Sequence, residues 1–137
     1  MQIRMRMRMR MRTVSLIGGC ALLLTACTEH DGAVPSAGPT VTSTAAPSTA
    51  RALAERYQRA GGDESVYAIQ QEEGPEGAPL LILRTTHTST ENALFEEQRD
   101  SVVTYLTRFE QLSTARGYLM DVFGRDGSLL HRWDARP

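Results

Sequence analysis

The residue types that most often carry out chemistry are few in this chain, and they follow no recognised spacing. His87 follows one apolar run and His131 lies in another, and either histidine could bind a metal together with a nearby carboxylate. Their spacing matches no known set of zinc ligands, so solvated histidines at strand ends are the alternative. The sequence also contains no nucleophile elbow, phosphate-binding glycine loop or HExxH motif. We therefore expect a protein that is not an enzyme and that uses no cofactor and no metal.

Two further sets of polar residues have both a functional and a structural interpretation. Arg84 and Asp121 each interrupt an apolar run, so they could form a cross-strand ion pair or line a ligand cleft. The alternative places both on a solvent-exposed face of a sheet. Glu72, Glu73 and Glu76 cluster beside glycine and proline. Paired carboxylates can perform acid–base chemistry, but an acidic loop of this composition is more often simply solvated.

Aromatic residues near the C-terminus are the best candidates for a binding surface. Tyr118 and Trp133 lie in two apolar runs separated by Asp126-Gly127, a dipeptide that favours a hairpin. On an uncovered sheet face, Tyr118, Arg132 and Trp133 would form a patch of the composition enriched at protein interfaces. If the two aromatic residues face a helix instead, they belong to the core. We predict partner binding through these three residues.

The first 27 residues have the layout of an export signal. The start from Met1 to Arg12 is rich in arginine, with a Met-Arg repeat from Met5 to Arg12, and an apolar stretch of 13 residues runs from Val14 to Ala26. A bilayer-spanning helix needs about 20 apolar residues, so an uncleaved anchor is the weaker interpretation. Leu24-Thr25-Ala26-Cys27 resembles the lipobox of bacterial lipoproteins, in which the cysteine is acylated and the chain is cut just before it.

That resemblance implies a lipid anchor on Cys27 and a place on the extracytoplasmic face of a cell membrane. The alternative acceptor, Cys20, would leave too short an apolar region before it. The only membrane contact expected is the covalent lipid. Thr28, rather than aspartate, follows the acylated cysteine, which favours the outer membrane if the cell has two membranes.

Cleavage before Cys27 changes the charge of the chain. Residues 27–137 keep 10 of the 15 arginines and all 16 acidic residues, a net charge of −6 with histidines neutral. An acidic domain is a poor partner for nucleic acid, because phosphate neutralisation drives most of that binding. Lipidation of Cys27 would leave no free thiol, which excludes thiol catalysis and disulfides in the mature chain.

Composition divides the chain into three parts. Residues 1–26 are the removed signal, 27–49 a lipidated cysteine with a flexible Thr/Ser/Pro/Ala linker, and 50–137 a folded domain. Helices are predicted over 50–60 and 88–114, and strands over 65–71, 80–86, 118–123 and 128–133. Residues 72–78 are predicted to be a loop.

The long helix is the best defined of these elements. Thr88 and Glu91 fit a capping box at its start. Its buried face is predicted to hold Phe95, Val102, Leu106 and Phe109, widened by Leu94, Val103 and Leu112. Because this helix joins two strands of one sheet, those strands should run parallel. The expected fold is a small two-layer α+β domain, helix-strand-strand-long helix-strand-strand, with a four-stranded mixed sheet and helices mainly on one face.

Two functions fit these features best. The first is a lipid-anchored, non-enzymatic module that binds a protein or envelope component. The second is an inhibitor or immunity protein against an exported enzyme, in which the acidic segment 72–76 would enter a basic active site. A small hydrolase is a distant third.

Overall fold

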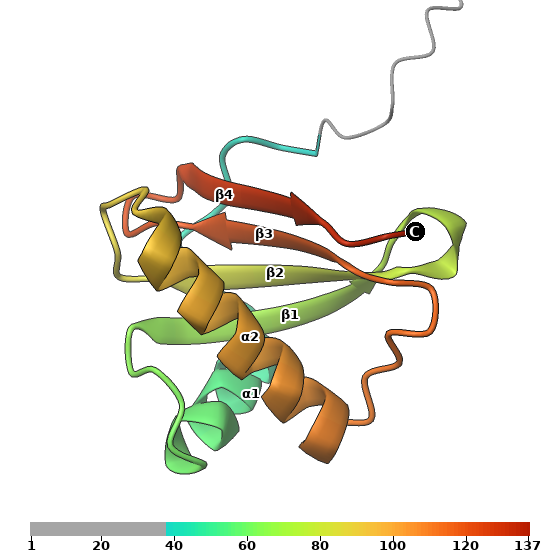
Figure 1. The fold of residues 1–137 in the computed structure, drawn as a ribbon. Coiled ribbons are helices and arrows are strands. Elements are labelled where there is room, and N and C mark those ends of the chain that lie inside the picture. Colours follow the sequence, from blue (N-terminus) through green and yellow to red (C-terminus); the bar gives the residue numbers. More distant parts are fainter. Residues whose placement is uncertain (1–37) are drawn as a thin grey trace, which may run out of the picture. The chain divides into compact units, whose positions relative to one another are not determined.

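The computed structural model describes residues 38–137, and its elements follow the predicted order (Figure 1). They are α1 (Ser48–Arg59), β1 (Val66–Glu73), the short 3-10 helix η1 (Pro75–Gly77), β2 (Pro79–Thr85), α2 (Asn92–Phe109), β3 (Leu119–Phe123) and β4 (Leu129–Asp134). The predicted small α+β domain is therefore confirmed.

One mixed sheet joins the four strands in the order β1-β2-β3-β4. β2 and β3 pair in parallel, with Leu80 opposite Leu119, and the two outer pairs are antiparallel. The predicted parallel pairing across α2 is confirmed. The β3–β4 hairpin turns at Asp126 and Gly127, where Asp126 Oδ1 accepts a hydrogen bond from the Ser128 backbone N–H at 2.9 Å and Gly127 adopts a φ of +80°.

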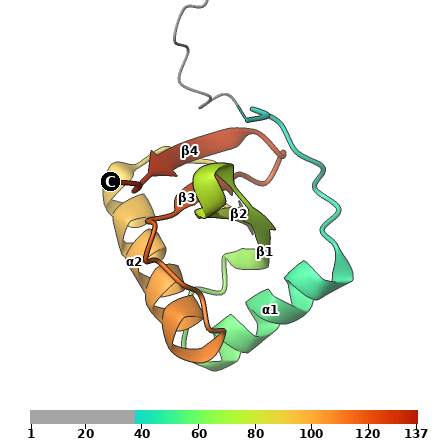
Figure 2. The ribbon, with the colours of Figure 1, turned by 90° about the vertical axis from the view of Figure 1, so that its right-hand side faces the viewer.

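The helices and the sheet form two layers with a further segment behind them. α2 crosses one face of the sheet and α1 packs beside β1, whereas residues 38–47 run along the opposite side from α2 (Figure 2). The core lies between the sheet and the helices. Its largest fully buried apolar side chains are Tyr57, Phe123, Ile69, Leu81, Leu83, Leu106, Met120, Val66 and Val102. Burial of each such side chain contributes about 1.5–3 kcal/mol.

Residues 38–47, here called the strap, are part of the folded domain. The Leu129 N–H donates to Thr40 O at 2.8 Å and the Thr42 N–H donates to Gly127 O at 2.9 Å, which forms a bridge between Val41 and Ser128. The sequence places these residues in the flexible linker, whereas the structure holds them along the start of β4. The strap is held through backbone groups, which every residue has, so an apolar pattern does not reveal it. Ser48 and Thr49, also assigned to the linker, instead begin α1, so the folded domain starts earlier than predicted. Residues 27–37 of the predicted linker lie outside the described residues.

Helix α2 begins later than the capping box predicts. Its N-cap is Glu91, which has extended backbone angles, and no side chain caps the helix. The Glu91 N–H instead donates to Ser89 Oγ at 3.2 Å. A local turn of this kind competes with helix formation, so the prediction of a start at Thr88 is wrong.

The same helix also ends earlier than predicted, at Phe109 rather than near Thr114. Gln111 adopts a φ of +58°, and the Leu112 N–H donates to Leu106 O at 3.1 Å. This turn brings Leu112 into the core with 7 % exposure and leaves Phe109 63 % exposed. The prediction that Phe109 lies on the buried face is therefore wrong, because the chain reverses just after it.

Candidate functional site

The three residues predicted to bind a partner do not share one face of the sheet. Tyr118 packs against the core cluster on the α2 side, and burial raises the pKa of its hydroxyl. Trp133 lies on the same side, since its ring is 6.2 Å from that of Phe95 in α2. Arg132 points to the other face, where its Nε donates to Asp121 Oδ1 at 2.8 Å and its Nη2 donates to Pro39 O of the strap at 3.1 Å. The structure therefore brings Tyr118 and Trp133 together and separates Arg132 from them.

Arg99 of α2 completes the aromatic group in place of Arg132. Its guanidinium carbon lies 4.4 Å from the centroid of the Trp133 ring and 5.9 Å from that of Phe95. The Phe95 ring stacks on His131 at 4.3 Å. Burial lowers the pKa of His131, which favours the neutral form of this packed ring. Sequence reasoning missed Arg99 because only the packing of α2 on β4 brings it over the tryptophan.

Trp133 stays partly open despite these contacts. It is 38 % exposed at the edge of the sheet, because β4 is the last strand. The strap pairs with the first residues of β4 only; among residues 38–137, no backbone group hydrogen-bonds to the outer edge of the strand beyond Leu129. The Trp133 ring, with the Arg99 guanidinium over it, therefore lies beside an open strand edge.

The sheet face opposite α2 is covered, whereas one interpretation of the sequence placed Arg84 and Asp121 on a solvent-exposed face. Arg84 and Asp121 are 6 % and 5 % exposed, and the strap covers them. Arg84 Nε donates to Ser43 O at 3.0 Å, and its Nη1 donates to Gln70 Oε1 at 3.1 Å. Arg84 therefore binds neutral oxygens, whereas Asp121 pairs with Arg132, so the possible Arg84–Asp121 ion pair is not formed. These contacts hold the strap in place.

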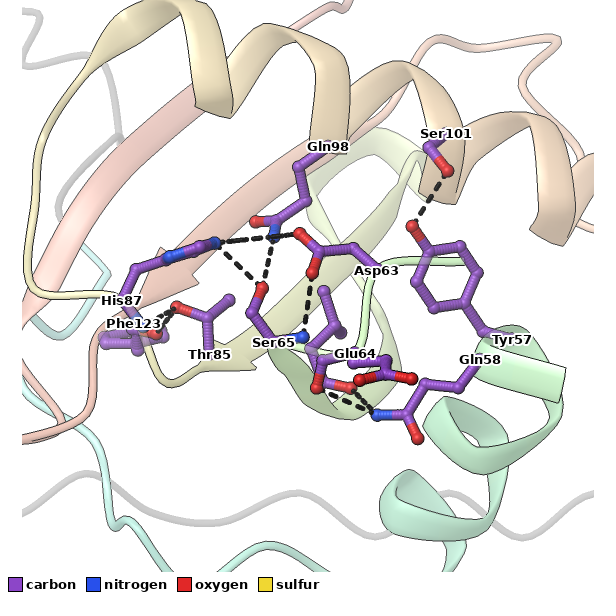
Figure 3. Close-up of polar contacts among 11 residues, drawn as sticks. Tyr57, Gln58, Asp63, Glu64, Ser65, Thr85, His87, Gln98, Ser101 and Phe123 are labelled. Atoms are coloured by element: carbon purple, nitrogen blue, oxygen red, sulfur yellow. Dashed lines mark hydrogen bonds and ion pairs between the residues drawn. The ribbon is translucent and has the colours of Figure 1, made fainter. Parts of the chain in front are cut away.

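His87 belongs to a polar cluster between the turn after α1, the end of β2 and the middle of α2 (Figure 3). Its Nε2 is 2.8 Å from Ser65 Oγ. Gln98 Nε2 donates to Asp63 Oδ2 at 2.8 Å and to Ser65 Oγ at 3.2 Å. Partial burial acts to raise the pKa of Asp63, but hydrogen bonds from Ser65 and Gln98 outweigh it and hold the pKa below its usual value. Sequence reasoning treated His87 as a solvated strand end and missed its three partners, which lie up to 24 positions away in the chain.

The hydrogen bonds of this cluster can form at the same time, so the cluster has a structural role in joining its three elements. When Gln98 donates its two hydrogens to Asp63 and Ser65, the Ser65 hydroxyl is free to donate to the His87 Nε2 lone pair. A catalytic triad needs the carboxylate on the other ring nitrogen. Here Asp63 Oδ2 faces the same Nε2, at 3.7 Å. The cluster contains the residue types of a triad without its geometry.

Next to this cluster, two adjoining cavities form a groove between α2 and the turn that follows α1, here called the α2 groove. Their volumes are about 400 Å³ and about 300 Å³, and both are lined by Tyr57, Gly61, Gly62 and Ser101. The Tyr57 hydroxyl lies 2.8 Å from Ser101 Oγ, which joins the floor to the α2 wall (Figure 3). Volumes of this size fit a small ligand. No sequence motif marks this groove, since its walls come from separate elements.

The turn at the floor of the α2 groove depends on two glycines. The Gly61 N–H donates to Gln58 O and the Gly62 N–H to Tyr57 O, which ends α1. Gly61 has a φ of +91°, a conformation that glycine adopts without strain. The predicted helix stop at Gly61-Gly62 therefore also shapes the groove.

Within residues 38–137 no group of three histidine, cysteine or acidic side chains is placed to hold a metal ion. Helices in this part of the chain are too short or too polar to cross a bilayer. Cys27 and the lipobox lie outside the described residues. Comparisons of the chain with protein-family models, curated proteins and solved structures find no match.

Proposed function

We propose that this protein is a lipid-anchored, non-enzymatic binding module of the bacterial cell envelope. The lipobox-like sequence ending at Cys27 supports the anchor. The anchor would hold the domain on the extracytoplasmic face of a membrane, and Thr28 favours the outer membrane of a two-membrane cell. The net negative charge of residues 27–137 favours a protein partner over nucleic acid.

The observation that carries this proposal is the exposed ring of Trp133 beneath Arg99. Tryptophan and arginine are the residue types most enriched where interfaces gain their binding energy. A 38 %-exposed indole presents an apolar area, and the guanidinium 4.4 Å from its centroid, which is paired with Asp100 at 2.8 Å, adds hydrogen-bonding groups beside it. It also lies beside a strand edge that can accept a further strand from a partner. The proposed surface therefore comprises Trp133, Arg99 and the accessible part of Tyr118.

The anchor is tested by the intact mass of protein extracted from membranes, with Cys27→Ala as the comparison. We expect a mass that corresponds to residues 27–137 plus acyl chains, and loss of that species in the variant. A full-length, unmodified mass would contradict the anchor and the predicted location together.

The binding surface is tested by crosslinking in intact envelopes followed by identification of the captured protein. Trp133→Ala should lower capture about tenfold or more, since interface tryptophans contribute about 2 kcal/mol or more. Phe109→Ala is the matched control, because it removes another exposed aromatic ring, 63 % exposed, at the far end of α2. Equal capture by both variants and the wild type, at unchanged thermal stability, would refute the Trp133 surface.

The acidic turn favours a second candidate, an inhibitor or immunity protein. β1 continues to Glu73, beyond the predicted strand end, because Glu72 and Glu73 pair with Leu80 and Pro79. The turn that follows lies at the tip of the β1–β2 hairpin (Figure 1). Arg116 Nη1 donates to Glu76 O at 3.0 Å, while the Glu76 side chain stays 83 % exposed.

A turn held in this way presents carboxylates on a fixed backbone, as an inhibitor that enters a basic active site requires. Reversing the charges of Glu72, Glu73 and Glu76 together should abolish inhibition of a captured enzyme. Unchanged inhibition would exclude this mechanism.

A further inference from the structure

The α2 groove has opposite charges toward its two ends. Glu97 lines the smaller cavity and Arg108 the larger one. Neither side chain forms a hydrogen bond or an ion pair with another residue in the described part of the chain. They lie eleven positions apart on α2, about 16 Å along the axis at about 1.5 Å per residue. A ligand with a cation at one end and an anion at the other matches this arrangement.

Gln98 adds an acceptor at the acidic end. The residue is only 5 % exposed and lines the smaller cavity. Its Nε2 donates to Asp63 and Ser65, whereas its Oε1 accepts no hydrogen bond from residues 38–137. Because no fully buried side-chain nitrogen or oxygen in this range lacks a partner, Gln98 Oε1 must be reached by solvent. This end of the groove therefore offers two carboxylates and one amide oxygen to a donor.

The charges select among ligand types. Asp63 and Glu97 at this end repel anions and favour an ammonium group, which has three donors and no acceptor. Asp100, on the wall between the ends, is paired with Arg99 at 2.8 Å. The middle of the groove is formed by Gly61 and Gly62, which cover the buried Tyr57 ring and carry no side chain of their own. The far end adds the Phe109 ring beside Arg108. A ligand with an amine at one end, a narrow middle part and a carboxylate at the other end matches this order of groups.

We propose that the α2 groove binds the free amino-terminal end of a short extended peptide. Its ammonium group lies among Asp63, Glu97 and Gln98 Oε1, its backbone crosses Gly61 and Gly62, and its carboxylate faces Arg108. An extended peptide of four residues is about 13 Å long at about 3.3 Å per residue, which fits within the span of the groove. This activity goes beyond the proposed partner binding at Trp133 and uses none of the residues of that surface.

The test uses tetra-alanine and two blocked forms, with the isotope-labelled full chain in detergent micelles. Amide shifts of Gly61, Gly62 and Ser101 report binding by NMR titration. We expect tetra-alanine to bind with a Kd of about 1 mM. N-acetylation should weaken binding about tenfold, since it removes charge-assisted hydrogen bonds. Amidation of the carboxylate should weaken it about threefold, because Arg108 is exposed.

Two substitutions locate the ammonium group. Glu97→Gln should weaken binding of tetra-alanine about threefold and leave the acetylated peptide unaffected. Glu96→Gln is the matched control, since Glu96 is the neighbouring exposed carboxylate on α2 and does not line the groove. Both variants keep the side-chain volume and the contacts of the core, so folding is not affected.

Three results would overturn the proposal. The first is equal binding of free and acetylated tetra-alanine, and the second is the same loss of affinity in Glu96→Gln as in Glu97→Gln. The third is the absence of shifts at Gly61, Gly62 and Ser101 at about 10 mM peptide, ten times the expected Kd. None of these results bears on capture through Trp133, so the two proposals fail separately.

Discussion

Gly62 contacts the ring of Tyr57 so closely that no side chain fits between them. A Cβ atom on Gly62 would lie 2.4 Å from both Cε2 and Cζ of Tyr57. Ordinary contact between carbon atoms needs about 3.5 Å or more, so an alanine at this position overlaps the ring by about 1 Å. Tyr57 has little freedom to move away, because it is 1 % exposed and its hydroxyl lies 2.8 Å from Ser101 Oγ.

We expect Gly62→Ala to destabilise the domain by about 2–3 kcal/mol, the upper part of the range for overpacked cores. For a domain of this size, that change lowers the thermal midpoint by about 10 °C or more. Gly61→Ala is the comparison, since its Cβ would have no atom within 4 Å and only the φ of +91° opposes it. That left-handed conformation costs alanine about 1 kcal/mol.

Urea denaturation measures both effects as a shift of the midpoint at unchanged slope. A Tyr57→Leu background isolates the cause, because the shorter side chain leaves space beside Gly62. In that background Gly62→Ala should cost about 1 kcal/mol or less, a coupling of about 1–2 kcal/mol. If Gly62→Ala changes the free energy of unfolding equally in both backgrounds, the overlap with the Tyr57 ring is not the cause.

Two further predictions concern ion pairs. Arg132→Ala leaves the buried Asp121 carboxylate without its cation and should lower the free energy of unfolding by about 2–4 kcal/mol in urea denaturation. A change below about 0.5 kcal/mol would contradict this. Hydrogen bonds from Arg136 hold the pKa of Asp134 at about 2, below the usual 3.8. A lowered pKa in the folded state contributes stability above pH 3.8 that is lost as the pH falls through about 2. Arg136→Gln should return the pKa of Asp134 toward 3.8 in a carboxyl NMR titration, and a value that stays near 2 would assign the shift to another group.

The fold was largely predictable because its signals are local. The order of elements follows from runs of apolar residues and from glycines at their ends, such as Gly61-Gly62 after α1. The parallel pairing of β2 with β3 follows from one helix between two strands of the same sheet. The limits of α2 were not predictable, because neither coincides with a loss of the apolar pattern. A local hydrogen bond to Ser89 delays its start, and the left-handed turn at Gln111 follows its last residue.

The candidate sites were predicted only in part. Trp133 and Tyr118 stand out as aromatic residues in a predicted hairpin, and the structure keeps them on one side of the sheet. Arg132 was grouped with them by its position in the chain, but neighbours in a strand point to opposite faces. Once the α2 side holds Trp133, Arg132 must face Asp121 and the strap.

By itself, the sequence determined the class of the fold, the acidic character of the domain and a lipobox-like cysteine whose acylation remains a prediction. These properties depend on composition and short-range pattern, which need no partner elsewhere in the chain. Tertiary structure alone decided the role of His87, the course of the strap and the α2 groove. Each depends on groups far apart in sequence, such as Gln98 beside Asp63 and Ser43 against Arg84. Hydrogen bonds of this kind form only after packing has placed their donors and acceptors within reach.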